Sequence, residues 1–177
     1  FTNEVRLMSI DDPFRFVLPE KVDVRATLNW STPYAHDVVL TGSAIEDDEA
    51  YFYAIVAYTE KDWWTYYFGM VYDQWISDRH KAQDHIDKLA GLRKNNRDVN
   101  FHLSLGTLSL QTANKITKKL VGEIEGLLIY SNWHEDLTNK KKVGGFSSNK
   151  SFHITNTGFI KHLETSEIAY GVFYRDT

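Results

Sequence analysis

The sequence predicts an α/β fold of the α+β kind, in which a small, mainly antiparallel sheet is flanked by helices. Two runs rich in aromatic and β-branched residues, 51–59 and 63–71, are separated by only three polar residues, which is typical of a β-hairpin. Apolar residues then recur at helical spacing in two segments, 76–92 and 116–128. An alternating run at 101–105 lies between them and predicts a strand. The expected order is therefore β-β-α-β-α.

Chain length and composition favour one domain. The chain has 177 residues, of which 42% are hydrophobic and 14% aromatic, enough to fill one hydrophobic core. We find no internal repeat and no linker-like segment in it. We therefore predict a single domain over residues 1–177, with a central core at about 50–140, an N-terminal extension at 1–49 and a C-terminal extension at 141–177.

The N-terminal extension is expected to consist of strands and loops. Residues 14–18 and 22–26 run or alternate in apolar character, and prolines interrupt the segment. An acidic cluster at 46–49 predicts a solvated turn just before the hairpin.

The helical segments have recognisable limits. The first begins after Gln74 and ends in the polar run 94–98, and Thr112 is a candidate N-cap for the second. Gly106 is expected to weaken the far end of the strand between them.

The C-terminal extension is predicted to be a loop followed by short strands. Residues 131–148 are polar and end in a glycine- and serine-rich stretch, which favours a loop. Short extended runs at 152–154 and 169–174, on either side of a turn at 156–158, would add strands to the same sheet.

Composition excludes several classes of protein. The chain contains no cysteine, so disulfides, thiolate catalysis and zinc ribbons are excluded, and any metal must be held by oxygen or imidazole. The net charge of −4 argues against a protein that coats nucleic acid through a broad positive field. Because no long apolar run and no secretory signal pattern occur, we expect a soluble, cytoplasmic protein.

Two aromatic tripeptides stand on the hairpin, Tyr51-Phe52-Tyr53 and Tyr67-Phe68-Gly69, and Arg79 follows ten residues after the second. In this order the residues resemble the GIY-YIG nuclease family over about residues 50–140, with the tripeptides in the places of its two signature motifs. The resemblance implies a β-β-α-β-α core and cleavage of DNA with the help of a divalent metal. The catalytic residues that it implies, in chain order, are Tyr53, Tyr67, Arg79, His85, Glu125 and Asn139.

The chemistry of phosphodiester hydrolysis suits two of these residues in particular. Glu125 offers a hard oxygen ligand for Mg²⁺, for which Mn²⁺ could substitute, although Glu123 is an alternative ligand. Arg79 offers a planar, permanently charged fork that matches a phosphate. Alternatively, it is a solvated residue in a surface ion pair. Asn139 could position Glu125 or a phosphate by hydrogen bonding.

The attacking water needs a group that orients or deprotonates it. Tyr53 or Tyr67 could do so, provided that local charge lowers the pKa of the phenol from its usual value of about 10. Taken alone, both tyrosines could equally be hairpin aromatics that fill a sheet face. His85 could carry the proton instead, with His80 as the alternative histidine.

Affinity for DNA is expected to come from a local basic patch. The candidates are Lys81 and the run Lys140, Lys141 and Lys142. RNA is not excluded as a substrate, and two copies could pair to cut both strands of a duplex.

The sequence thus predicts a metal-dependent endonuclease in a restriction-like or phage-related role. The alternative is a catalytically inactive module that keeps the fold and binds nucleic acid or protein.

Overall fold

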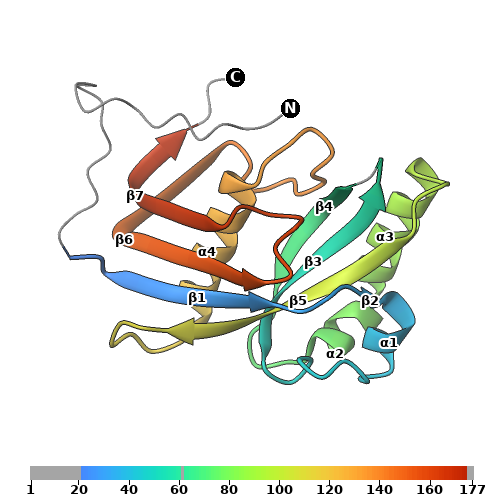
Figure 1. Cartoon of the computed structure of the whole chain (residues 1–177), viewed down its shortest axis with the longest axis horizontal. Coiled ribbons are helices and arrows are strands. Elements are labelled where there is room, and N and C mark those ends of the chain that lie inside the picture. The colour runs from blue at the N-terminus through green and yellow to red at the C-terminus, as the bar shows by residue number, and fades with distance from the viewer. Residues whose placement is uncertain (1–20, 61, 175–177) are drawn as a thin grey trace.

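The computed structural model describes residues 21–60 and 62–174, and the extended run expected at 14–18 lies outside them. Within these residues the fold is α+β, as predicted: seven strands form one curled sheet with four helices packed against it (Figure 1). The strands are β1 (Val24–Trp30), β2 (Tyr34–Ala35), β3 (Ala50–Thr59), β4 (Asp62–Met70), β5 (Phe101–Leu110), β6 (Gly145–Gly158) and β7 (Ser166–Tyr174).

The four helices are α1 (His36–Leu40), α2 (Ile76–Lys81), α3 (Gln83–Asn95) and α4 (Lys118–Ser131). The longest of them, α4, has 14 residues. Across the described ranges, no helix combines the length and the apolar character that a bilayer crossing requires.

The sheet is mixed, which corrects the prediction of a mainly antiparallel sheet. Its strand order is β4-β3-β5-β1-β6-β7, with β2 paired to β5. Strands β1 and β6 run parallel, with Val24 opposite Phe152 and Trp30 opposite Gly158, whereas the other ladders are antiparallel. A parallel pair needs a long crossover connection, and here most of the chain lies between the two strands. No local pattern in the sequence indicates such a pairing.

Strand β6 begins at Gly145, so it replaces only the last four residues of the loop expected at 131–148, and it also replaces the turn expected at 156–158. Asn156 is buried in the strand, and Gly158 ends it with a φ of +77°. A Cβ atom at residue 158 would lie 2.3 Å from the backbone oxygen of Trp30. The glycine therefore permits close contact between β6 and β1, and the chain reverses only after it, before β7 begins at Ser166.

The hairpin of β3 and β4 forms as predicted, and β5 pairs with the other side of β3. Strand β5 continues past Gly106 to Leu110, contrary to expectation. A Cβ atom at residue 106 would lie 3.2 Å from Phe52 and from the ring of Trp30. The missing side chain thus makes room for the indole and leaves the strand intact.

The single helix expected after Gln74 is two helices. Ala82 has an extended backbone, with φ −70° and ψ 141°, and separates α2 from α3. The second predicted helix begins at Lys118, where the hydroxyl of Thr117 accepts a hydrogen bond from the backbone of Leu120. Thr112 therefore does not cap it, which corrects that prediction. Instead, the hydroxyl of Thr112 accepts a hydrogen bond from the backbone of Arg25.

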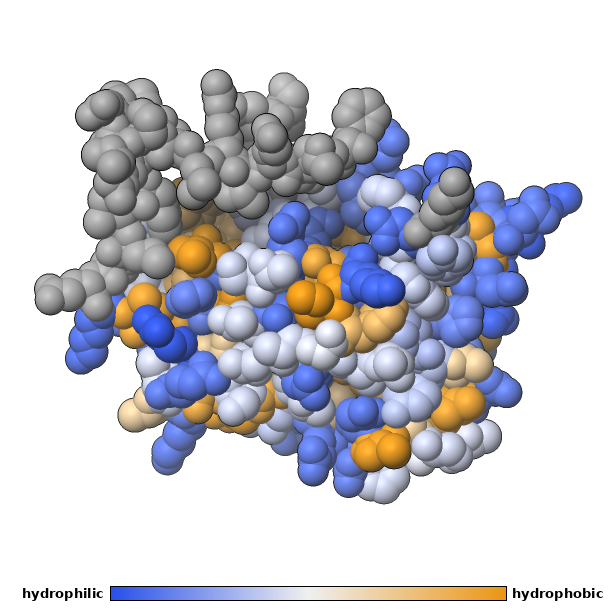
Figure 2. All heavy atoms as spheres, in the orientation of Figure 1, coloured by the Kyte–Doolittle hydropathy of each residue, from blue (hydrophilic) through white to orange (hydrophobic). Residues whose placement is uncertain are grey.

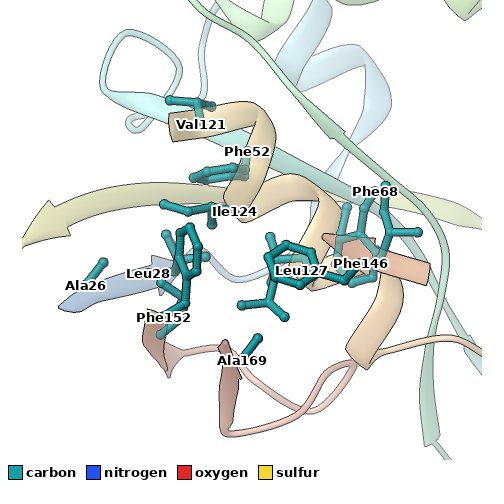
Figure 3. Packing of buried hydrophobic residues seen from close by; sticks show 14 of the residues in the cluster. Ala26, Leu28, Phe52, Phe68, Val121, Ile124, Leu127, Phe146, Phe152 and Ala169 are labelled. Atoms are coloured by element: carbon teal, nitrogen blue, oxygen red, sulfur yellow. The ribbon is translucent and has the colours of Figure 1, made fainter. Parts of the chain in front are cut away.

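Two hydrophobic clusters lie on opposite faces of the sheet, because alternate residues of β3 belong to different clusters. Helix α4 covers the first cluster and directs Val121, Ile124 and Leu127 into it (Figure 3). Helices α1 to α3 cover the second, which contains Tyr53 and Leu89. On the face seen in Figure 2, hydrophobic residues form small separate groups among hydrophilic ones.

A buried polar network joins α4 to three strands. The carboxylate of Glu167, which is 2% exposed, accepts hydrogen bonds from the amides of Asn132 at 3.0 Å and Asn156 at 2.8 Å. The oxygen of the Asn156 amide accepts a bond from the indole of Trp30 at 3.0 Å. Burial raises the pKa of Glu167 to about 7, although the two amides favour its ionised form.

We expect this carboxyl to make folding less favourable as the pH rises. Its pKa is higher in the folded state, so its contribution is full below the unfolded pKa of about 4.5 and is lost as the pH rises through about 7. Between about pH 5 and about pH 8, this carboxyl is expected to lower the free energy of unfolding by roughly 2–3 kcal/mol. Glu167→Gln keeps the oxygen that accepts from both amides but cannot titrate, so its free energy of unfolding should change less with pH. Urea titrations at about pH 5 and about pH 8 test this. The same pH dependence in both proteins would contradict it.

Candidate active site

The position of Tyr53 depends on the glycine of the second tripeptide. Strand β3 places Tyr53 opposite Gly69 of β4. A Cβ atom at residue 69 would lie 2.3 Å from Cζ and from the hydroxyl oxygen of Tyr53. The phenol therefore lies across the glycine, and the residue is 1% exposed.

The register of the hairpin sets the direction of Tyr67. Ile55 pairs with Tyr67, while the next residue of β3 pairs with Thr65, which leaves Tyr66 as the additional residue. Because Ile55 stands two residues after Tyr53 on the same strand, Tyr67 lies on the same face as Tyr53, and the centroids of the two rings are 6.1 Å apart. The hairpin thus brings together the two tyrosines that the sequence predicts for the site.

His85 of α3 lies against both tyrosines. Its two ring nitrogens are 3.3 and 3.4 Å from the hydroxyl of Tyr53, and its ring centroid is 6.3 Å from that of Tyr67. The side chain is buried, and burial lowers its pKa to about 4, with the charges of Arg79 and Lys88 lowering it further. At neutral pH the imidazole is therefore uncharged, and a ring nitrogen can accept a hydrogen bond.

His80, the alternative histidine, lies deeper. Its ring nitrogens have no hydrogen-bond partner among the described residues. Its ring centroid lies 4.6 Å from that of Tyr53 and 4.9 Å from that of His85. Burial lowers its pKa to about 3. In a continuous helix, residues five apart would point in directions about 140° apart. The break at Ala82 is what brings the two histidine rings together.

Arg79 is held in a two-point ion pair. Its guanidinium donates to both carboxylate oxygens of Asp84, at 2.7 and 3.2 Å, and remains partly exposed. The surface ion pair considered from the sequence is therefore present. Even so, the charge of Arg79 acts on the phenols of Tyr53 and Tyr67 and lowers the pKa of each.

The net pKa shift of both phenols is upward. Burial raises the pKa of Tyr53 well above its usual value, and burial followed by the charge of Glu125 raises that of Tyr67. The condition under which a tyrosine would deprotonate water is therefore not met, which corrects that part of the sequence interpretation. Neutral phenols can still orient a water or donate a hydrogen bond.

Glu125 and Glu123 point to different surroundings. Lys142 pairs with Glu125 at 2.6 Å, and Lys150 of β6 pairs with Glu123 at 3.0 Å. Only Glu125 lines a pocket together with Tyr67, and its charge raises the pKa of that phenol. Of the two glutamates, Glu125 is thus the one beside the tyrosines.

The pocket beside Glu125 has a volume of about 690 Å³. Helix α3, helix α4, strand β4 and the loop at 138–142 form its walls. The lining residues are Tyr67, Lys88, Gly91, Leu92, Asn95, Glu125, Ile129, Thr138, Asn139, Lys140, Lys141 and Lys142.

Asn139 lines this pocket, but its amide is used elsewhere. The amide oxygen accepts a hydrogen bond from the backbone nitrogen of Phe68 at 2.9 Å, and the amide nitrogen donates to the backbone oxygen of the same residue at 2.8 Å. Its observed partner is therefore β4, and not Glu125. Asn139 positions the loop that carries the three consecutive lysines.

The lysines predicted to bind nucleic acid divide into two groups. Lys140, Lys141 and Lys142 line the pocket. Lys81 of α2 is exposed, pairs with Asp78 at 3.2 Å and does not belong to the pocket lining.

Lys88 is a site residue that the sequence interpretation missed. Its ammonium nitrogen lies 3.4 Å from the ring centroid of Tyr67, and burial lowers its pKa to about 8. Lys88 lies three residues after His85 and four before Leu92, on one face of α3. That spacing was the available signal.

The pocket wall offers one carboxylate as a metal ligand, that of Glu125. In residues 21–60 and 62–174, no three His, Asp or Glu side chains converge as a metal-binding group. Mg²⁺ keeps several waters and needs only one or two carboxylates, so Glu125 on the pocket wall suits it. Lys142 would have to leave the carboxylate first.

Comparisons with known proteins give no family assignment: no protein-family model matches the chain, and neither curated proteins nor solved structures contain a significant match.

Proposed function

We propose that this chain is a Mg²⁺-dependent endonuclease that hydrolyses phosphodiester bonds in DNA through a GIY-YIG-like core. One observation carries the proposal: Tyr67 and Glu125 line one pocket, and Arg79, which does not line it, lies near enough for its charge to lower the pKa of Tyr67. Phosphodiester cleavage needs such a combination of cation, carboxylate and hydroxyl. The order of β3, β4, α2 with α3, β5 and α4 agrees with the core that the resemblance implies.

The residues divide the work as follows. The neutral phenol of Tyr67 orients the attacking water, and the guanidinium of Arg79 binds the phosphate and offsets the charge of the transition state. His85, uncharged at neutral pH, lies 3.3 Å from the hydroxyl of Tyr53 and can accept a hydrogen bond from it, which would orient this phenol. Glu125 would hold Mg²⁺, which supplies Lewis-acid stabilisation of the leaving oxygen.

The test is nicking of supercoiled plasmid by the purified protein with Mg²⁺, with Mn²⁺ or with a chelator. Arg79→Ala is expected to lower the rate by about 100-fold or more, since it removes charge stabilisation of the transition state. Arg93→Ala is the matched control, because it removes the same side chain from an exposed position of α3 and is not among the charges that shift the pKa of Tyr53 or Tyr67. A DNA oligonucleotide and an RNA oligonucleotide of equal length, compared under the same conditions, decide between the two substrates. Cutting that persists in the chelator, or an equal effect of both variants, would contradict the mechanism.

A second candidate function is a module that binds nucleic acid without cutting it. The observation that favours it is the contact of Lys142 with Glu125, because this contact neutralises the proposed metal ligand. Binding of DNA without cleavage by the wild-type protein, with either metal, would support this alternative.

The contact of Lys142 with Glu125 is expected to weaken metal binding. Lys142→Met is expected to tighten Mn²⁺ binding about three- to tenfold, because the metal no longer competes with an ammonium group. Lys141→Met is the control, since Lys141 is its neighbour in the same pocket wall but is not the partner of Glu125. Free Mn²⁺ measured by electron paramagnetic resonance, without DNA, gives both affinities. Weaker binding by the Lys142 variant would contradict the metal position.

A further inference from the structure

We propose that the pocket between α3, α4 and the loop at 138–142 holds one unpaired nucleotide of the substrate strand, so that the site cuts next to an unpaired position. This inference rests on the proposed nuclease function and names its substrate class. A pocket of about 690 Å³ is much larger than a metal ion with its waters requires, and it lies in the range of sites that hold small organic ligands.

The charge of the lining favours an anionic occupant. The pocket wall contains four lysines and one glutamate, so its formal charge is 4 − 1 = +3, in a chain whose net charge is −4. Positive charge is therefore concentrated at this position. Lys142 is engaged by Glu125, whereas Lys140 and Lys141 are exposed on the loop, where they can reach phosphates on either side of the bound nucleotide.

The remaining lining suits a base. Leu92 and Ile129 are buried apolar side chains of the wall, and Asn95 offers an exposed amide that can pair with a base edge. A Cβ atom at Gly91 would meet no atom within 4 Å, so the backbone of α3 is open there to a flat ligand. The wall thus combines an apolar surface, a hydrogen-bonding group and cations, which together match the three parts of a nucleotide.

A paired base cannot use such a pocket. Within a duplex, a base offers only its groove edges, because its faces are stacked and its pairing edge is occupied. Entry requires the base to leave the stack, and the cost is smallest when the nucleotide is already unpaired. Because Glu125 and Tyr67 belong to the same wall, a nucleotide bound here would place its own phosphate beside the proposed catalytic groups.

The experiment compares oligonucleotide substrates of equal length: a continuous duplex, the same duplex with a short single-stranded flap, and a single strand. We expect cleavage of the flap substrate to be at least about tenfold faster than that of the duplex. Gly91→Leu, which fills the open wall of the pocket, should lower this ratio to about 1. Ala90→Leu adds the same side chain at the adjacent, exposed position of α3, which does not line the pocket, and should preserve the ratio.

Fluorescence anisotropy of the same oligonucleotides in a chelator separates this inference from the proposed function. If no substrate is cut with either metal, the nuclease proposal fails, but tighter binding of the flap that Gly91→Leu abolishes still supports the pocket. Equal binding and equal cleavage of flap and duplex would overturn the inference. An equal effect of the two leucine variants would also overturn it. So would displacement of the bound flap, seen as a fall in anisotropy, by an acidic peptide at equal concentration.

Discussion

Glu125→Gln is expected to lower the rate of Mg²⁺-dependent plasmid nicking by at least about 100-fold, with little change in the free energy of unfolding. The amide keeps the size of the carboxylate but loses the charge that a hard cation requires. The carboxylate already lies against the ammonium of Lys142 at 2.6 Å, so its position can accommodate a cation. The measurement is the nicking rate over a range of Mg²⁺ concentrations.

Glu123→Gln is a closely matched control for this substitution. Glu123 lies two residues earlier on the same helix, its side chain is 14% exposed against 15% for Glu125, and it also pairs with a lysine. Because it faces β6 and not the pocket, its replacement should leave nicking within about twofold of wild type. If the two variants lose activity equally, Glu125 has no special role.

Gly69→Ala is expected to have the largest effect on the shape of the site. The added methyl group would overlap the phenol of Tyr53, so the buried ring must move or β4 must separate from β3. Overpacking of this kind costs about 1–3 kcal/mol of stability. Because Tyr53 contacts His85, we also expect nicking to fall by about tenfold or more.

Gly122→Ala provides the comparison in a helix. A Cβ atom there would make only an ordinary contact, 3.9 Å from the end of Met70, so the substitution should stabilise α4 by up to about 1 kcal/mol. Urea unfolding of both variants measures the two effects. A Gly69 variant as stable as the wild type would mean that Tyr53 has another low-energy position.

Short-range patterns predicted the parts of the fold that depend on neighbouring residues. Aromatic and β-branched runs identified β3 and β4, and helical spacing identified α4 and the region of α2 and α3. The break at Ala82 was missed because alanine is a strong helix former and gives no local signal. The β1–β6 ladder was missed because it is made by residues far apart in the chain.

The candidate site was predictable in its residue types but not in its connections. Arg79 and Glu125 were proposed from their spacing and chemistry, and their charges do act on the same phenol. The partners of the site residues were not predictable: the contact of Asn139 with β4 and that of Lys142 with Glu125 depend on the path of a loop. Lys88 was missed because a charged residue on a helix usually faces solvent.

The contacts of the 134–139 segment with β4 also bear on self-association. Strand β4 is the outermost strand at its end of the sheet, and an outermost strand presents backbone groups that can recruit another strand. Here the side chains of His134, Thr138 and Asn139 occupy backbone groups of Thr65, Tyr66 and Phe68, respectively. Damage to this segment would therefore free a template for strand addition, and intermolecular aggregation would accompany any loss of the pocket wall.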